Sequence, residues 1–500
     1  MKIKINQQLT SLKARQAEDL DHLVIAMAPV KGTRAWPTFP HAAVVKERWR
    51  RAGKSTDSTA PLVTELPNRR GTRLSFAVID NKINSFDLLA LARKLIAPHL
   101  ESDPAALTVQ LVGHDAPAAG RISEALTAAA AAGVGEMPSF KRKPDKPKRL
   151  RQITFHGVEE LPDVKRTLAE AEGNNLARRL TGLPPNMLTP GQYRTQVEAL
   201  AKEHGWRMQF HGIDALKRKK AGAFLAVAQG SEERDAGIVH LRYRPKGKKT
   251  SARRAPLALV GKGICFDTGG TNLKPAKHMF GMHEDMEGSA VALGTLLALT
   301  RMQVDFPVDC WLALAQNHIG PKAYKQNDVV TAGNGTSIEI VHTDAEGRMV
   351  LADTLALACK EKPSLIVDYA TLTGTCVYAL GTTYSGAFTN RGEFIQEIMA
   401  AGARSGERVW PFPTDEDFDH GLHSTVADVK QCAVEGEADH ILAARFLDRF
   451  VDNRIPWIHI DLSAGSHKGG LAHIPTDITG FGVRFTVNLL LDGALFPEGG

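Results

Sequence analysis

Two short stretches of the sequence place charged side chains at the ends of apolar runs. They are Gly261–Asp267 and His342–Arg348, and their charged residues of interest are Lys262, Asp267, Asp344, Glu346 and Arg348. The apolar runs are typical of buried strands, where an unpaired charge is energetically costly. Something of opposite charge must therefore compensate the carboxylates. A pair of divalent metal ions is the compensation that these residue types predict.

Two further charged residues between these stretches are candidates for the same site. Lys274 precedes a proline, and Asp285 comes just before a helical pattern. Asp344 and Glu346 are two residues apart, so in an extended segment they point to the same side. Carboxylates from three regions suit divalent ions and can bridge two of them. Taken singly, each stretch also fits a salt-bridge network, and Lys262 also fits a surface lysine at a strand-end turn. The two stretches taken together favour a metal site.

Strand and helix patterns alternate along the chain, which predicts an α/β fold with mixed sheets flanked by helices. Continuous apolar strands between helices indicate a sheet covered on both faces. In such sheets the ligand site lies beyond the carboxyl ends of the strands, where Lys262, Asp267 and residues 369–374 fall. The expected strands are 74–79, 107–112, 153–155, 238–243, 257–266, 308–315, 365–369 and 457–462. The expected helices are 86–97, 122–132, 163–180, one capped by Thr189, 287–301, 347–361, 392–403 and 438–452.

The length of the chain and a break in its composition predict two domains. Residues 141–151 contain seven basic residues, one acid and two prolines, which is typical of a boundary or an exposed crossing. We therefore expect an N-terminal α/β domain over 1–150 with this basic linker at its end. A linker strand and a connecting helix follow over 151–180. The larger C-terminal domain, 181–500, is expected to be catalytic, because the first domain carries no catalytic constellation.

Charge and cysteine content bound the class of function. Residues 1–151 hold 25 lysines and arginines against 14 acids, a net +11, which leaves −4 for the remainder of the total +7. This basic part could attract nucleic acid, and a solvated face with a basic linker is the plainer explanation. No apolar run is long enough to span a membrane, and the N-terminus lacks a signal-peptide pattern. The five scattered cysteines indicate reduced thiols, so we expect a cytoplasmic protein.

The ordered series of motifs closely resembles the leucyl aminopeptidase (cytosol aminopeptidase) family. The family hallmark Asn-Thr-Asp-Ala-Glu-Gly-Arg-Leu corresponds to residues 342–349, which read His-Thr-Asp-Ala-Glu-Gly-Arg-Met. The N-terminal domain resembles the family only in layout. The other matching stretches are 261–267, 274–275, 285–286, 327–330, 351–353, 370–374, 379–381 and 479–480.

The resemblance implies a metal-dependent aminopeptidase with two divalent ions per subunit, Mn²⁺ or Zn²⁺ and alternatively Co²⁺ or Mg²⁺, roughly 3.5–4 Å apart. Asp267 and Glu346 would bridge the ions, and Asp344 would complete one site. Lys262 and Asp285 would complete the other. A lysine binds a metal only as the neutral amine, which two adjacent dications would favour.

The resemblance also implies roles around the metals. Lys274 would stabilise the oxyanion, and Arg348, which stays protonated, would hold a bicarbonate that shuttles the proton. The substrates would be peptides with a free N-terminus. Backbone groups would come from Leu372 and Gly374, and the pocket for the first side chain from Met282, Thr371 and Ala464.

Departures from the family pattern leave alternatives open. His342 replaces the asparagine beside the ligands, and it is either a new neighbour of the metal ligands or a satisfied structural histidine. Ser466 and His467 stand where the family commonly has an apolar wall, so a preference for leucine does not follow. The resemblance further implies a homohexamer. The competing functions are an additional nucleic-acid-binding role of the N-terminal domain and a catalytically inactive scaffold.

Overall fold

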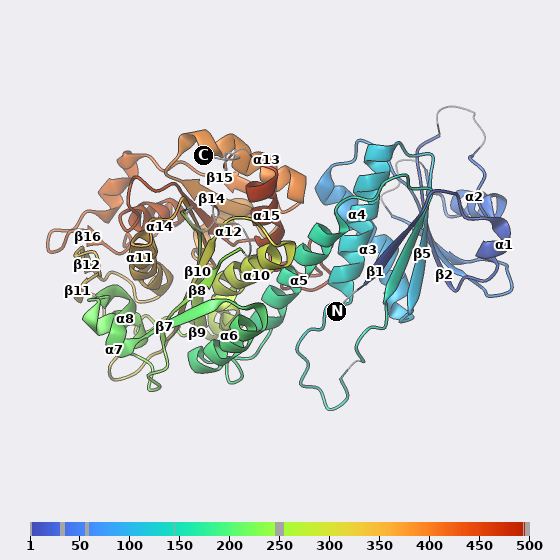
Figure 1. Ribbon diagram of the computed structural model, residues 1–500. Helices are drawn as coiled ribbons and strands as arrows, with labels where there is room; N and C mark the ends of the chain where they lie inside the picture. The colour runs from blue at the N-terminus through green and yellow to red at the C-terminus, as the bar shows by residue number, and fades with distance from the viewer. Residues whose placement is uncertain are drawn as a thin grey trace. The chain divides into compact units, whose positions relative to one another are not determined.

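The computed structural model describes residues 3–30, 36–55, 60–144, 146–245, 255–493 and 495 (Figure 1). The chain divides into two compact units. The N-terminal unit runs to Ala171 and also includes Lys468–Asp477, and the C-terminal unit comprises Glu172–His467 and the chain from Ile478. The division falls inside helix α5 (Val164–Thr181), which confirms the helix expected over 163–180.

The N-terminal unit contains a six-stranded sheet in the order β1-β6-β5-β2-β4-β3. All neighbouring strands are parallel except β3 and β4. The strands are β1 (Lys4–Gln8), β2 (His22–Met27), β3 (Leu62–Glu65), β4 (Arg73–Val78), β5 (Ala106–Val112) and β6 (Gln152–His156).

Helices cover both faces of this sheet because successive strand residues point to opposite sides. Val24 and Ala26 pack in one apolar cluster with α3 (Ser85–Glu101) and α4 (Ala116–Gly133), which lie side by side in Figure 1. Leu23, Ile25 and Met27 pack in a second cluster with α2 (Ala42–Arg51). A short helix, α1 (Ala14–Ala17), joins β1 to β2.

One segment of the N-terminal unit comes from late in the chain. Ala472 is buried in the cluster of α3 and α4. Arg93 of α3 donates hydrogen bonds to the carbonyl oxygens of Gly469, at 2.9 Å, and of Ile474, at 2.5 Å. The residues on both sides of Lys468–Asp477 belong to the C-terminal unit. The chain therefore contributes to the N-terminal unit twice.

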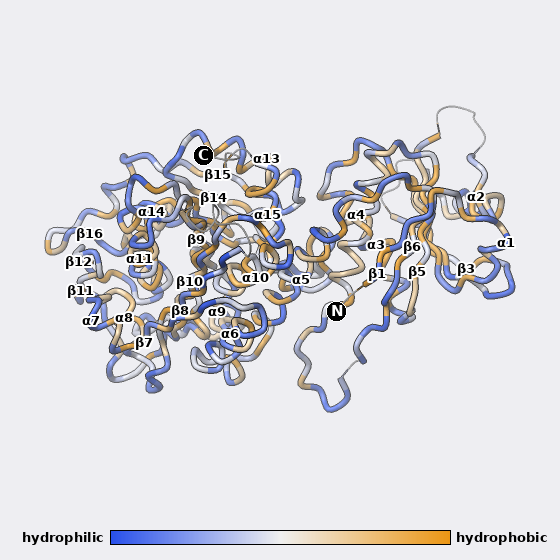
Figure 2. Tube along the Cα trace, in the orientation of Figure 1, coloured by the Kyte–Doolittle hydropathy of each residue, from blue (hydrophilic) through white to orange (hydrophobic). Residues whose placement is uncertain are grey.

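The C-terminal unit is built on an eight-stranded mixed sheet in the order β15-β14-β17-β13-β9-β10-β8-β7. Its four central strands, β17, β13, β9 and β10, are parallel, and Figure 2 shows β9 and β10 as largely hydrophobic. The strands are β7 (Arg207–Gly212), β8 (Gly237–Tyr243), β9 (Leu257–Asp267), β10 (Val308–Asn317), β13 (Leu365–Ala370), β14 (Ser385–Thr389), β15 (Val409–Pro411) and β17 (Trp457–Asp461). A separate small sheet contains β11 (Val329–Thr331), β12 (Ser337–Glu339) and β16 (Val429–Lys430).

Helices pack on both faces of the central strands. Ala258 and Val260 of β9 lie in one cluster with α8 (Gly222–Ala228), α11 (Glu346–Cys359) and α14 (Asp439–Asp448). Gly261 meets α10 (Glu287–Met302) so closely that an added Cβ would lie 2.4 Å from Ser289 Cα. The remaining helices are α6 (Pro190–His204), α7 (Ile213–Arg218), α9 (Ala276–Met279), α12 (Gly374–Leu380), α13 (Ile395–Ser405), α15 (Val483–Leu491) and the 3₁₀ helices η2 (Met282–Met286), η3 (Gly392–Phe394) and η4 (Glu416–Leu422).

The predicted α/β fold with mixed sheets flanked by helices is confirmed, and so are the individual strands and helices expected from the sequence. Thr189 caps α6, as expected, by accepting a hydrogen bond from the backbone of Gln192. All five cysteines are free. Within the described residues, no helix has both the length and the apolar character needed to cross a membrane. Elements that the sequence did not predict include β1, β2, β7, β14, α8 and α12.

Candidate metal centre and active site

The candidate site lies at the carboxyl ends of the central parallel strands, where open α/β sheets place their ligands. β9 ends at Asp267, β13 leads into Thr371–Gly374, and β17 leads into Leu462 and Ser463. A cavity of about 870 Å³ opens there. The predicted site residues that line it are Lys262, Asp267, Lys274, Met282, Asp285, Asp344, Glu346, Arg348, Thr371, Leu372 and Gly374.

Ala464 is the predicted site residue that this arrangement leaves out. It is fully buried and does not line the cavity. Its backbone N–H donates to Ser385 Oγ, and its carbonyl oxygen accepts from Thr479 Oγ1. The cavity wall in this region is formed instead by Ser463 and Ser466. The small side chain of Ala464 packs in the protein interior. Ser466 makes the cavity wall polar, as expected.

Three carboxylates meet at one point of the cavity. Ligand oxygens of Asp267, Asp344 and Glu346 all lie within 4.8 Å of one another. Asp267 is the last residue of β9 and Glu346 the first of α11, so two rigid elements aim them at each other. Asn317 Nδ2 donates to Asp267 Oδ1 at 2.8 Å and to the Thr343 carbonyl oxygen at 3.0 Å. One amide thus ties the end of β9 to the loop that carries Asp344.

The two lysines bridge these carboxylates. Lys262 Nζ lies 2.7 Å from Asp285 Oδ1 and 2.9 Å from Glu346 Oε1. Lys274 Nζ lies 2.9 Å from Asp267 Oδ2 and 2.5 Å from Asp344 Oδ1. Room for Lys262 depends on Gly347, where an added Cβ would come within 2.7 Å of Lys262 Cε. The glycine in the hallmark motif is therefore a packing requirement of the lysine.

Burial and mutual repulsion set the charges of this cluster. Burial, reinforced by the charges of Asp267 and Glu346 and opposed by Lys274, raises the pKa of Asp344 to about 7. Burial likewise raises the pKa of Asp285 well above its usual range. Burial alone would lower the pKa of Lys262, but the carboxylates around it outweigh burial and raise that pKa. The protein thus concentrates negative charge where cations must balance it.

Two oxygens of the cluster are available to an additional cation. Asp285 Oδ2 and Glu346 Oε2 are buried and have no hydrogen-bond partner among the residues that the structure describes. Buried carboxylate oxygens are normally hydrogen-bonded or bound to a metal. Four carboxylates, two of them with an unsatisfied oxygen, and two amines form a donor set that fits a pair of divalent ions.

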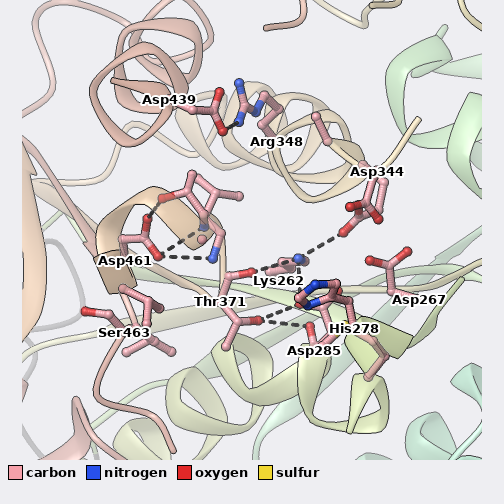
Figure 3. A pocket seen from close by; sticks show the side chains of 18 of the residues that line it. Lys262, Asp267, His278, Asp285, Asp344, Arg348, Thr371, Asp439, Asp461 and Ser463 are labelled. Atoms are coloured by element: carbon pink, nitrogen blue, oxygen red, sulfur yellow. Dashed lines mark hydrogen bonds and ion pairs between the residues drawn. The ribbon is translucent and has the colours of Figure 1, made fainter. Parts of the chain in front are cut away.

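Arg348 has a partner that the sequence did not predict. Its side chain is 2% exposed. Nη2 lies 2.7 Å from Asp439 Oδ2 (Figure 3). Nη1 donates to the Gln431 carbonyl oxygen at 3.1 Å. Asp439 also lines the cavity. No local motif marks it, because its partner is 91 residues away in the sequence.

Gln431 holds the loop that carries the hallmark motif. Its Oε1 accepts from the backbone N–H groups of Val341, at 3.2 Å, and His342, at 3.1 Å. Its Nε2 donates to the Ala345 carbonyl oxygen at 3.0 Å. His342 Nδ1 in turn accepts from the Asp344 backbone N–H at 3.2 Å. His342 lines the cavity, so it is both hydrogen-bonded within the loop and exposed to the site.

Asp461 was also missed, and it holds the loop that follows β13. Its Oδ1 accepts from the backbone N–H of Leu372 at 3.1 Å, and its Oδ2 accepts from Thr373 Oγ1 at 2.7 Å. The same loop is fixed at its other end by Thr371, whose Oγ1 donates to Asp285 Oδ1 at 2.7 Å and whose carbonyl oxygen accepts from Lys262 Nζ. Asp461 therefore sets the position of the backbone groups at 372–374.

Another carboxyl group lines the cavity at the start of α10. Glu287 is 1% exposed, and burial raises its pKa to about 8. The backbone of Gly480 donates to this carboxyl group, and Oε1 has no partner among the described residues. Together with Ser463 and Ser466 it makes this part of the cavity polar.

Comparisons with known proteins also indicate a metal-dependent peptidase. The chain matches the catalytic domain of the cytosol aminopeptidase family over residues 175–487. It is 36% identical over 346 residues to a probable cytosol aminopeptidase of Persephonella marina, covering 69% of this chain and 68% of the relative. A probable cytosol aminopeptidase of Prochlorococcus marinus, strain MIT 9211, is 35% identical over 443 residues, covering 85% of this chain and 88% of the relative.

Two solved structures share the fold. A mutant of tomato leucine aminopeptidase superposes with a TM-score of 0.84 at 26% identity, covering 98% of this chain and 97% of that chain. The bottromycin maturation enzyme BotP, in complex with Mn, superposes with a TM-score of 0.79 at 29% identity, covering 93% of this chain and 98% of that chain. The carboxylate cluster, the matched catalytic domain and these relatives lead to one conclusion: the chain belongs to the cytosol aminopeptidase family and is a metal-dependent aminopeptidase.

Proposed function

We propose that the protein removes N-terminal residues from peptides with two divalent ions bound in the carboxylate cluster. The observation that carries this proposal is the convergence of Asp267, Asp344 and Glu346 within 4.8 Å, beside the paired Lys262 and Asp285. Asp267 and Glu346 would be shared between the ions, Asp344 would complete one site, and Asp285 with Lys262 the other. Bound there, the ions would supply Lewis-acid activation of a water and of the peptide carbonyl.

Residues of the chain orient the substrate around that centre. Lys274 is held at the edge of the cluster by Asp267 and Asp344, where its ammonium can stabilise negative charge that develops on the carbonyl oxygen. The backbone of Leu372–Gly374, fixed by Asp461, offers hydrogen-bonding groups to the substrate main chain. The first side chain would lie against Met282 and Thr371, with Ser463 and Ser466 nearby.

The predicted bicarbonate at Arg348 stays a prediction, since two nitrogens of the guanidinium have partners and Nε has none among the described residues. Both terminal nitrogens of Arg348 are engaged, by Asp439 and by the Gln431 carbonyl oxygen. A bicarbonate at Nη2 would displace the Asp439 carboxylate or lie beside it, which would place two anions side by side. We therefore assign no step to bicarbonate.

Chelation is expected to abolish peptidase activity, and added Mn²⁺, Zn²⁺ or Co²⁺ is expected to restore it. The reason is that the four carboxylates hold no other cation strong enough to activate water at neutral pH. The measurement is hydrolysis of a panel of aminoacyl amides by the chelator-treated and dialysed protein, with each metal added back. Activity that survives complete metal removal would contradict the proposal. Comparison across the panel also reveals which first residue the polar cavity wall accepts.

A second function, nucleic-acid binding by the N-terminal unit, rests on the exposed basic residues of the stretch 141–151, including Lys141, Arg142 and Lys143. Phosphate contacts predict duplex binding at low salt that weakens steeply as the salt concentration rises. Fluorescence anisotropy of the full chain with a labelled duplex measures this. Absence of binding at low salt would leave the basic residues as a solvated surface. The homohexamer and the cytoplasmic setting stay predictions.

A further inference from the structure

We propose that Thr371 is a positioning residue of the metal centre: its hydroxyl and its carbonyl group hold Asp285 and Lys262 so that Asp285 presents Oδ2 to one of the two ions. This inference rests on the proposed function, because it concerns the ions bound in the carboxylate cluster. It gives the loop after β13 a part in metal binding, in addition to the contact with substrate that the family resemblance assigned to Thr371.

The close packing of three elements brings Thr371 to this place. β13 pairs in parallel with β9 up to the residue before Lys262, so the chain that follows runs alongside Lys262. α10 begins directly against the end of β13, since a Cβ added to Gly288 would lie 2.2 Å from the Tyr369 carbonyl oxygen. Asp285 lies in η2, which leads into α10. The fold therefore brings Asp285 and Lys262 within reach of Thr371.

Thr371 contacts both members of the Lys262–Asp285 pair (Figure 3). Its Oγ1 donates to Asp285 Oδ1 at 2.7 Å, and its carbonyl oxygen accepts from Lys262 Nζ at 2.9 Å. Lys262 Nζ also lies 2.7 Å from Asp285 Oδ1. The three residues thus form a closed ring of hydrogen bonds. This ring fixes the rotation of the Asp285 carboxyl group, because turning it would break two hydrogen bonds at once.

The ring distinguishes the two oxygens of Asp285. Oδ1 has two donors, the ammonium of Lys262 and the hydroxyl of Thr371. Oδ2 is buried and has no hydrogen-bond partner among the residues that the structure describes. Buried carboxylate oxygens are normally hydrogen-bonded or bound to a metal. Oδ2 is therefore the oxygen left to a cation, and the Thr371 hydroxyl helps to keep it so.

The positioning concerns one of the two proposed ions. Asp344, which would complete the site of the other ion, is held differently. Its Oδ1 lies 2.5 Å from Lys274 Nζ, and its backbone N–H donates to His342 Nδ1 at 3.2 Å. Within the described part of the chain, no hydrogen bond joins Asp344 to Thr371. Removal of the Thr371 hydroxyl should therefore weaken the binding of one ion and spare the other.

The test is calorimetric titration of the metal-depleted, full-length protein with Mn²⁺. Thr371→Val keeps the shape of the side chain and the carbonyl group but removes the hydroxyl, so one of the two Mn²⁺ affinities is expected to fall by about 10–100-fold. Thr371→Ser keeps the hydroxyl and is expected to bind both ions as the wild type does. An effect of packing alone would show the reverse order, because serine lacks the methyl group that valine retains.

Thr375→Val is the matched control. Thr375 lies in α12, its Oγ1 accepts from the backbone N–H of His440 at 2.9 Å, and it does not line the cavity. Its substitution removes a hydrogen bond of a hydroxyl without touching a proposed ligand, so both Mn²⁺ affinities should stay at the wild-type values. Electron paramagnetic resonance of unbound Mn²⁺ at two equivalents counts the bound ions independently. Circular dichroism melting without metal shows whether each variant is folded.

The proposal would be overturned by a Thr371→Val protein whose two Mn²⁺ affinities both lie within about threefold of the wild type. A Thr371→Ser protein as impaired as Thr371→Val would also overturn it, because the effect would then belong to packing. An equal fall in both affinities would do the same, since the hydroxyl would not act through Asp285. A wild type that binds no Mn²⁺ would instead refute the proposed metal pair itself, so the two failures are distinguishable.

Discussion

Replacement of Glu346 by glutamine is expected to remove metal binding and to lower kcat/KM by more than about 100-fold. Loss of an outer partner of a metal ligand alone typically costs 10–100-fold, and Glu346 is proposed to contact both ions directly. An amide carries no negative charge, so the variant also loses the attraction that brings two dications together. Glu346 is 1% exposed and starts α11, so no neighbouring side chain can take its place.

The measurements are metal content by mass spectrometry after gel filtration, and melting temperature with and without Mn²⁺. Ligand binding to the folded protein stabilises it by about 2.7 kcal/mol at a hundred times Kd, so the wild type should gain stability and Glu346→Gln should gain little. Glu361→Gln is the matched control. Glu361 lies just after the same helix in an exposed pair with Arg242. Equal metal content in Glu346→Gln and wild type would refute the ligand assignment.

Replacement of Lys274 by methionine is expected to lower kcat by roughly 10²–10³-fold while changing KM little, as removal of one oxyanion donor does in other hydrolases. The ammonium is held by two carboxylates, 2.9 Å from Asp267 and 2.5 Å from Asp344, and the charges of these neighbours raise the pKa of Lys274 despite its burial. It therefore stays charged at neutral pH. Methionine keeps the apolar stem and removes only the charge.

Steady-state kinetics with a good amide substrate and saturating Mn²⁺ separates kcat from KM. Lys277→Met is the control, because Lys277 is exposed on α9 and does not line the cavity. Metal content must be measured as well, since Lys274 contacts two proposed ligands. A Lys274→Met protein with full metal occupancy and unchanged kcat would show that the oxyanion is stabilised by the metals alone.

The strands of the C-terminal unit could be predicted well because they are recognisable in the sequence as long apolar runs. β9 and β10 are buried along nearly their whole length, so their sequences are largely apolar, and β9 carries Lys262 at its middle and Asp267 at its carboxyl end. Asp267 then marks the carboxyl end of β9 without any knowledge of tertiary structure. The fold predicted from these runs is confirmed, and so are the family and the enzyme class that the motif resemblance implied.

Other features left no local trace. Asp439, Gln431 and Asp461 act through partners 83 to 91 residues away, and in each case the spacing repeats no known motif. In the N-terminal unit, β2 is a central strand, but its six residues, His-Leu-Val-Ile-Ala-Met, are too few for periodicity to separate a buried strand from part of a helix. Ala464, which the resemblance placed in the pocket for the first side chain, is fully buried, and its neighbours Ser463 and Ser466 line the cavity.

The late segment Lys468–Asp477 has a consequence for how this protein can be recombined. The N-terminal unit is discontinuous: its core includes Ala472, and Arg93 binds the carbonyl oxygens of Gly469 and Ile474. Exchanging residues 1–171 with those of a relative would leave the segment facing a foreign core. A viable chimaera must therefore transplant both pieces together.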